Sequence, residues 1–208
     1  EWARRGARIA VADLAEAAAA ETVAEITAAG GTAVAIAANV LQTESIAAAA
    51  ATAEAALGEL DIVMNNVGGM VNGHPEDIPL AEWLRIMEIN YFGAVRGVTH
   101  FLPKFLARGR GHIVCTASFA GMFPYAASRV PYASAKAADI SMSQNLAIYC
   151  EPRGVRVSCL IPGPVLTAVM DSCTEWTDGC ELRAPGKETT LMLPEEVARV
   201  LPDGMEAG

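Results

Sequence analysis

Tyr132 and Lys136 lie four residues apart in a stretch suited to acid–base chemistry. The alanine-rich segment from Tyr132 to Ala147 predicts a helix, with Pro131 tolerated at its first turn, so both side chains project from one face. A phenol titrates near 10 and carries protons poorly at neutral pH. An ammonium about 4 Å away is worth up to roughly 4 kcal/mol at an effective dielectric constant near 20, which would lower the pKa of Tyr132 by on the order of three units.

Ser118 supplies another polar group, fourteen residues before Tyr132. It follows the apolar run from His112 to Ala117, which predicts a buried strand. A hydroxyl at the carboxyl end of such a strand faces the crevice where open α/β sheets bind ligands. The alternative, that Tyr132 and Lys136 are an ordinary pair on a helix surface, does not account for this third residue.

The order of these residues resembles the short-chain dehydrogenase/reductase family. The resemblance rests on Ile-Val-x-x-x-Ser-x-Ala-Gly, which ends at Gly121, followed by Tyr-x-x-x-Lys. It implies an oxidoreductase in which Ser118 orients the substrate oxygen and Tyr132 moves the proton. Lys136 would lower the pKa of Tyr132 and hold the nicotinamide ribose. Asn90, in Met-Glu-Ile-Asn-Tyr-Phe-Gly, matches an asparagine that completes the proton relay; the alternative is a purely structural role in a helix bend.

Further segments resemble the cofactor contacts of the same family. Asp13 ends a predicted strand, where an acidic side chain binds the adenosine ribose and repels a 2′-phosphate, which favours NAD over NADP. Asp13 could instead cap the next helix. Besides Tyr132 and Lys136, the resemblance implies cofactor contacts at Asn39, Val40, Asn66, Val67, Gly68, Pro162, Gly163, Val165 and Thr167. Ordinary turns are the alternative for Asn39 and for the Pro-Gly segment.

Strand-like and helix-like segments alternate along the chain. Predicted strands cover 7–12, 32–38, 61–65, 112–117 and 155–160, and predicted helices cover 14–29, 43–57, 82–108, 132–147 and 194–208. Pro103 should bend or break one helix and Pro202 should interrupt another. Strands joined by helices of this length imply a parallel sheet covered on both faces, an α/β fold of the Rossmann-like, doubly wound kind. We expect a single, incomplete domain over residues 1–208, with a substrate lid at about 168–193.

The resemblance stops short at both ends of the chain. The glycine-rich phosphate loop of the family, Thr-Gly-x-x-x-Gly-x-Gly, would precede Glu1. We therefore expect the sheet to lack its first, central strand and the helix N-terminus that binds pyrophosphate, and to lack its last strand. Two alternatives to a working dehydrogenase stay open: a truncated, non-catalytic fragment or interaction module, and a family member with non-redox chemistry such as a dehydratase or epimerase.

Composition narrows the class of protein. Hydrophobic residues make up 52% of the chain and charged residues 19%, which is enough apolar content for a sizeable core. The net charge of -9 argues against nucleic acid or anionic membranes as partners, and no apolar run is long enough to span a membrane. Five cysteines without a Cys-x-x-Cys pair predict free thiols in a reducing compartment and no metal site. We expect a cytoplasmic enzyme for a small alcohol or ketone, a homodimer or homotetramer by family analogy.

Overall fold

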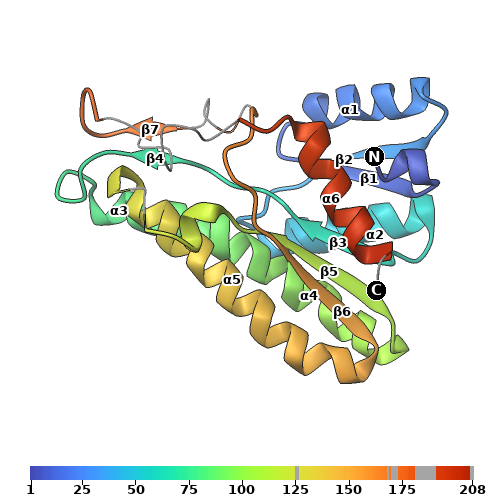
Figure 1. Ribbon diagram of the computed structural model, residues 1–208. Helices are drawn as coiled ribbons and strands as arrows, with labels where there is room; N and C mark the ends of the chain where they lie inside the picture. Colours follow the sequence, from blue (N-terminus) through green and yellow to red (C-terminus); the bar gives the residue numbers. More distant parts are fainter. Residues whose placement is uncertain (125–126, 168, 170–172, 181–190, 207–208) are drawn as a thin grey trace. The chain divides into compact units, whose positions relative to one another are not determined.

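The computed structural model describes residues 1–124, 127–167, 169, 173–180 and 191–206. The chain divides into two compact units, Glu1–Asp61 with Ala198–Gly208, and Ile62–Val197. The first unit has one parallel sheet and the second has two, and within the described ranges no strand pairing joins a sheet of one unit to a sheet of the other (Figure 1).

The first unit is built on two parallel strands, β1 (Arg8–Asp13) and β2 (Thr32–Ala37). Two alanine-rich helices, α1 (Glu16–Ala28) and α2 (Thr43–Leu57), pack against this pair. The small alanine side chains let each helix lie close to the strands, and Ala19, Ala50 and Ala53 are buried. Helix α1 connects the parallel strands β1 and β2, which is the crossover that the sequence predicted.

The start of α1 differs from the prediction by two residues. Asp13 accepts a hydrogen bond from the backbone N–H of Ala15 at 2.8 Å, which forms a side-chain turn ahead of the helix. The helix begins only at Glu16, and its N-cap residue is Ala15. The alternative in which Asp13 is the helix cap is therefore wrong.

The second unit carries the three-stranded parallel sheet β3 (Ile62–Asn65), β5 (Gly111–Thr116) and β6 (Val155–Leu160), in the order β3-β5-β6. The central strand is the core of the unit, since Ile113, Val114 and Cys115 are fully buried. Helices α4 (Gly93–Arg108) and α5 (Val130–Cys150) both pack against this sheet. The carboxyl ends of β3, β5 and β6 thus meet at one edge, beside the start of α5.

The long helix predicted at 82–108 consists of three parts. These are α3 (Leu80–Met87), a π-helical segment (Glu88–Phe92) and α4. Pro103 does not break the helix, because α4 continues through it to Arg108, with buried Phe101 and Phe105 on either side of the proline. The bend that was the other expectation at Pro103 stays a prediction. The irregularity falls at the π-helical segment instead, and π-bulges inside α-helices are frequent at functional sites.

Two very short strands were not predicted. β4 (Val71–Asn72) and β7 (Thr174–Glu175) pair in parallel, and two residues are too few to show a periodic pattern. β7 belongs to the predicted lid at 168–193; residues 168, 170–172 and 181–190 of that lid lie outside the described residues.

The last helix, α6, covers Pro194–Glu206 and runs through Pro202 without interruption, so the predicted break there is wrong. Leu201 and Pro202 are both buried, and this packing holds the helix despite the lost backbone hydrogen bond. The α/β class of the fold, with parallel strands joined by helices, is as the sequence predicted.

Candidate active site

Ser118 and Tyr132 meet at the carboxyl end of β5. Ser118 begins a short 3₁₀ turn, Phe119–Gly121, and its Oγ accepts a hydrogen bond from the N–H of Ala120 at 3.2 Å. Tyr132 lies in the first turn of α5, where the Ser118 side chain is close enough to its hydroxyl to oppose the rise of its pKa. The two hydroxyl groups that the sequence paired therefore lie close together.

Gly121 makes this approach possible. A Cβ atom at this position would lie 2.5 Å from the backbone carbonyl carbon of Lys136 and 2.5 Å from the N atom of Ala137. Backbone atoms in the middle of a helix cannot move aside, so only glycine lets the Ser118 turn lie directly on α5. Gly121 belongs to the motif that carried the family resemblance, but the sequence did not show why it is a glycine.

Tyr132 is held in an apolar setting. Its ring packs against the buried cluster formed by Val71, Ile78, Ile86 and Ala135. Burial raises the pKa of Tyr132 above its ordinary value of 10.0, an effect that the hydrogen bond from Ser118 and the charge of Arg129 oppose. The direction is opposite to the lowering predicted from the Tyr132–Lys136 spacing.

Lys136 explains the difference. Its ammonium donates to the backbone carbonyl of Thr116 at 2.7 Å and to Oδ2 of Asp139 at 3.2 Å, and the side chain is almost fully buried. The positive charge of Lys136 is thus balanced by Asp139, whose own charge helps to raise the pKa of Tyr132. In this arrangement the prediction that Lys136 lowers the pKa of Tyr132 is wrong.

Asn90 lies in the π-helical segment and is buried. Its amide group donates to the carbonyls of Gly69 and Ile86, both at 3.0 Å, and its Oδ1 accepts from the N–H of Gly69 at 3.2 Å. These bonds fasten the loop after β3 to the helix. The structural role considered as an alternative is therefore present; the role in a proton relay stays a prediction.

The loop after β3 lies against two of the predicted catalytic residues. A Cβ atom at Gly68 would lie 2.9 Å from Oδ1 of Asn90 and 3.9 Å from Nζ of Lys136. The preceding Asn66 accepts a hydrogen bond from the hydroxyl of Thr116 at 2.9 Å, while the side chain of Val67 is exposed. Asn66, Val67 and Gly68 therefore form one wall of the site, joined to the end of β5.

The segment after β6 forms another wall. The carbonyl of Pro162 accepts a hydrogen bond from the N–H of Phe119 at 2.9 Å, directly beside Ser118. A Cβ atom at Gly163 would meet nothing within 4 Å, so its backbone borders open space. Farther along, Val165 pairs with Met192, and Thr167 is exposed. These positions agree with the predicted side of the site; contact with a cofactor stays a prediction.

Asp13, Asn39 and Val40 belong to the first unit. The side chains of Asp13 and Asn39 both accept hydrogen bonds from nearby backbone N–H groups, Asp13 from Ala15 and Asn39 from Leu41 at 3.0 Å. The turn considered as the alternative for Asn39 is therefore present. The proposed contacts with ribose and adenine stay predictions.

The sequence reasoning missed Asp139. This residue stands three positions after Lys136 on the same face of α5, and 1% of its surface is exposed. Burial raises the pKa of Asp139 from 3.8 to about 6, against the opposing charge of Lys136. The sequence did contain a signal for Asp139, because an acidic residue three positions after Lys136 shares its face of the predicted helix.

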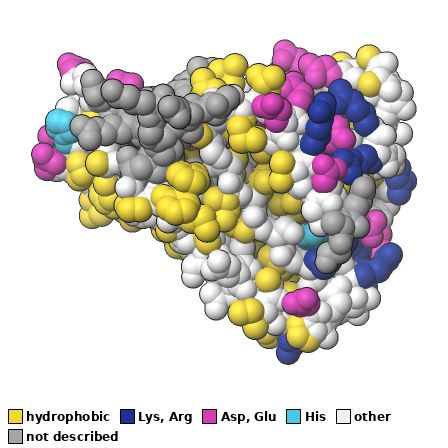
Figure 2. All heavy atoms as spheres, viewed as in Figure 1, with side chains coloured by type: hydrophobic (Ala, Val, Ile, Leu, Met, Phe, Trp, Pro, Cys, Tyr) yellow, Lys and Arg dark blue, Asp and Glu magenta, His cyan; other side chains and the backbone are white. Residues whose placement is uncertain are grey.

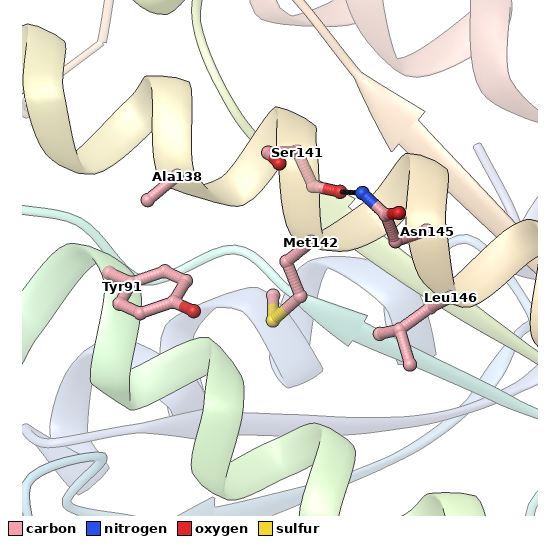
Figure 3. A pocket seen from close by; sticks show the side chains of 6 residues that line it. All are labelled: Tyr91, Ala138, Ser141, Met142, Asn145 and Leu146. Carbon is pink, nitrogen blue, oxygen red and sulfur yellow. Dashed lines mark hydrogen bonds between the residues drawn. The ribbon is translucent and has the colours of Figure 1, made fainter.

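A hollow on another part of α5 does not belong to this site. It is lined by Tyr91 of the π-helical segment and by Ala138, Ser141, Met142, Asn145 and Leu146 of α5 (Figure 3). Ser141 and Asn145 are joined there by a hydrogen bond of 2.8 Å. Neither Ser118, Tyr132 nor Lys136 lines it.

Three further findings concern the cysteines, possible metal sites and the helices. All five cysteines are free. Among the described residues, no group of three or more His, Cys, Asp and Glu side chains is placed to hold a metal ion. Over the same residues, none of the helices has both the length and the apolar character needed to cross a membrane.

Comparisons with known proteins agree with this geometry. The family model for short chain dehydrogenases matches residues 1–178. A 1-deoxy-11-beta-hydroxypentalenate dehydrogenase from Streptomyces exfoliatus is 35% identical over 176 residues, which cover 83% of this chain and 64% of that protein. The chain thus spans less than two thirds of the length of that relative.

Solved structures give the same result. A putative short-chain dehydrogenase/reductase from Burkholderia xenovorans has a TM-score of 0.77 at 32% identity, over 82% of this chain and 68% of the other. A 7α-hydroxysteroid dehydrogenase, solved with NADH and 7-oxo glycochenodeoxycholic acid, has a TM-score of 0.81 at 28% identity, over 96% of this chain and 77% of the other. With Ser118, Tyr132 and Lys136 gathered at the end of β5, the chain belongs to the short-chain dehydrogenase family.

Proposed function

We propose that this protein is an NAD-dependent oxidoreductase that interconverts a secondary alcohol and a ketone. The observation that carries the proposal is the approach of Ser118 to Tyr132, one helical turn before the buried Lys136 on α5. Two neighbouring hydroxyl groups from different elements can bind one oxygen atom and exchange a proton with it.

The residues at the site fit a nicotinamide cofactor. Gly68 presents backbone without a side chain beside Lys136 and Asn90, and Gly163 borders open space on the opposite wall. When bound, NAD supplies the redox chemistry of the reaction by accepting or returning a hydride. Lys136 would hold the nicotinamide ribose through its ammonium, which has three donor groups.

The side chains would handle the proton and the substrate oxygen. Ser118 would donate a hydrogen bond to that oxygen and fix its position. Tyr132 would take the hydroxyl proton during oxidation and return it during reduction. Because burial raises the pKa of Tyr132 in this structure, its phenol is protonated at neutral pH and is ready to donate in the direction of ketone reduction.

We propose NAD rather than NADP because of Asp13. Its carboxylate would accept hydrogen bonds from the adenosine ribose hydroxyls and repel a 2′-phosphate. Asn39 and Val40 would lie along the adenine, as the family resemblance implies.

The substrate class follows from two relatives. The hydroxypentalenate and hydroxysteroid dehydrogenases are both named for a hydroxyl group on a carbon ring system. We therefore propose a cyclic secondary alcohol, or its ketone, as the substrate. The exposed hydrophobic side chains of Leu80, Leu84, Met122 and Phe123, on and near α3 and the turn before α5, would favour an apolar ring; Figure 2 shows hydrophobic side chains gathered on the surface over this part of the second unit.

An assay with a panel of cyclic alcohols and ketones tests this function. Oxidation of at least one alcohol should reduce NAD, followed by absorbance of NADH, with little turnover when NADP replaces NAD. Turnover of a substrate without any change in NADH would overturn the redox assignment and favour a dehydratase or epimerase. Absence of both nucleotide binding and turnover would favour a non-catalytic fragment.

The assembly and location of the enzyme are further proposals. We propose a cytoplasmic homodimer or homotetramer that uses α4 and α5, as family analogy suggests. Ile148 and Tyr149, near the end of α5, are 75% and 51% exposed, which would suit a contact between copies. Light scattering of the purified chain measures the oligomer directly.

A further inference from the structure

Lys136 and Asp139 form an ion pair inside the second unit. Nζ of Lys136 lies 3.2 Å from Oδ2 of Asp139, and the two side chains are 5% and 1% exposed. They stand three residues apart on one face of α5, so the helix itself sets their spacing. A pair this deeply buried differs from the surface pairs that contribute little to a protein.

The pair directs the ammonium toward the reactive end of the sheet. The same Nζ atom donates to the carbonyl of Thr116 at 2.7 Å, at the end of β5. Gly68 approaches it from the loop after β3. Carboxylate and carbonyl thus use two of the three donors of the ammonium and leave one for a ligand.

The carboxylate of Asp139 bonds to Lys136 through one oxygen only. Within the part of the chain that the structure describes, its Oδ1 has no hydrogen-bond partner. A buried, incompletely bonded carboxylate is costly unless a cation lies beside it, and a buried ammonium is equally costly alone. Each member of the pair therefore depends on the other for its charge.

We propose that Asp139 is a positioning residue that holds the Lys136 ammonium at the Thr116 carbonyl and the Gly68 loop. This inference rests on the proposed dehydrogenase function of the site. It assigns to Asp139 an indirect role, through Lys136, and no contact with substrate or cofactor.

The proposal predicts a change near pH 6. The charged and titratable groups around Asp139 are Lys136 and Tyr132 on α5, Cys115 on β5 and Cys159 on β6. Burial raises the pKa of Tyr132 and of both thiols above their ordinary values, so none of these three groups gains or loses charge near pH 6. The pKa of Asp139 is about 6, and its protonation would release the ammonium of Lys136.

The main experiment observes the ammonium itself and needs no cofactor. Lysine labelled with ¹⁵N gives ammonium signals only where exchange with water is slow, as in a buried, hydrogen-bonded group, and the chain has only Lys104, Lys136 and Lys187. We expect one protected signal that is lost in Lys136→Met, is lost in Asp139→Asn and is kept in Asp139→Glu. In the wild type this signal should shift with a midpoint near pH 6.

A kinetic experiment connects the pair to the reaction. We expect kcat/KM of the wild type to fall about tenfold from pH 7 to pH 5, since a single group with a pKa near 6 would be mostly protonated at the lower pH. Asp139→Asn should be about tenfold less active at pH 7 and show no such fall. A side chain that only supports the fold would lower activity without flattening the pH profile.

The outcomes separate this inference from the proposed function. An unchanged ammonium signal and an unchanged pH profile in Asp139→Asn would overturn the role of Asp139, whatever the enzyme does. If Asp139→Asn fails to fold, the wild-type titration and Asp139→Glu decide: a signal that does not respond near pH 6 overturns the proposal. Loss of the signal in Asp139→Asn in a protein that binds no NADH would overturn the dehydrogenase function but not the charge pairing.

Discussion

At the residue scale, burial sets the proton affinity of the phenol in the candidate site. The phenol of Tyr132 is enclosed by the cluster around Val71 and Ile86, and its pKa is raised for that reason. The family resemblance implies that Tyr132 carries the proton. Its removal should therefore affect the reaction and leave the fold and nucleotide binding largely intact.

We predict that Tyr132→Phe lowers kcat by about 10²- to 10⁴-fold, the usual worth of a general acid or base. Affinity for NADH, measured by its fluorescence, should change little. Tyr149→Phe, on an exposed part of the same helix, is the matched control and should keep wild-type activity. Equal activity of Tyr132→Phe and the control would remove Tyr132 from the mechanism.

Asp139 should also make stability depend on pH. Its pKa is about 6 in the folded protein and 3.8, its ordinary value, in the unfolded chain, so the folded state binds more protons between these values than the unfolded state. Stability is then highest below pH 4 and is lost as the pH rises through about 6, by up to about 3 kcal/mol for this group. Asp139→Asn should abolish this decline in urea unfolding measured from pH 4 to pH 7.

His112 should act in the opposite direction. It is buried on β5, its Nε2 lies 2.8 Å from Oγ of Ser158, and burial lowers its pKa from 6.5 to about 4. The folded state therefore binds fewer protons than the unfolded state in this range, and stability is lost as the pH falls from about 6.5 to 4, again by about 3 kcal/mol. His112→Gln should remove that loss.

The two groups should nearly cancel in the wild type between pH 4 and pH 6. Each single variant then exposes the slope of the other: Asp139→Asn gains stability with rising pH, and His112→Gln loses it. Parallel slopes in both variants, measured by urea unfolding, would contradict the assignment of these two groups.

At the element scale, close contact between a turn and a helix places Ser118. The 3₁₀ turn at Phe119–Gly121 lies against the backbone of α5, and the missing side chain of Gly121 allows this. The π-helical segment plays a similar part on the other side, because it turns Asn90 toward Gly69. Two local irregularities thus position the site within an otherwise regular unit.

We predict that Gly121→Ala lowers kcat/KM by on the order of 100-fold, since a displacement of about 1 Å in a catalytic group has that effect. The added methyl group must push the Ser118 turn away from α5. Gly204→Ala is the matched control, because a Cβ atom there meets nothing within 4 Å. Activity assays and thermal melts of both variants separate a shifted turn from a weakened fold; wild-type kcat/KM in Gly121→Ala would show that the turn tolerates the methyl group.

At the scale of the whole molecule, the predicted cofactor residues are distributed over both units. Asp13, Asn39 and Val40 lie in the first unit, and the residues from Asn66 to Gly68 and from Pro162 to Thr167 lie in the second. Nucleotide binding by the 208-residue chain is therefore the most direct test of the molecule as a whole.

We predict that this chain binds NADH at least tenfold more tightly than NADPH, as measured by nucleotide fluorescence. The carboxylate of Asp13 would repel the 2′-phosphate, so Asp13→Ala should reduce the difference between the two nucleotides. Glu16→Ala, at the exposed start of α1, controls for the loss of one negative charge. Equal affinities in the wild type would contradict the preference for NAD.

The sequence by itself determined the family and the α/β class, and it singled out the candidate site residues. Alternating apolar runs and alanine-rich helices predicted most strands and helices, because hydrophobic periodicity depends on local burial. Ser118, Tyr132 and Lys136 were found because their order and spacing along the chain are themselves the signal.

Only the tertiary structure decided the electrostatics of the site and its fine geometry. The pKa of Tyr132 is raised rather than lowered because its ring is buried, while Lys136 bonds to Asp139 and Thr116. A spacing along a helix reveals neither how deeply a side chain is buried nor which neighbour a charge will contact. The need for glycine at position 121 depends on how closely two distant segments approach. Such contacts join residues that are far apart in sequence, so no local pattern records them.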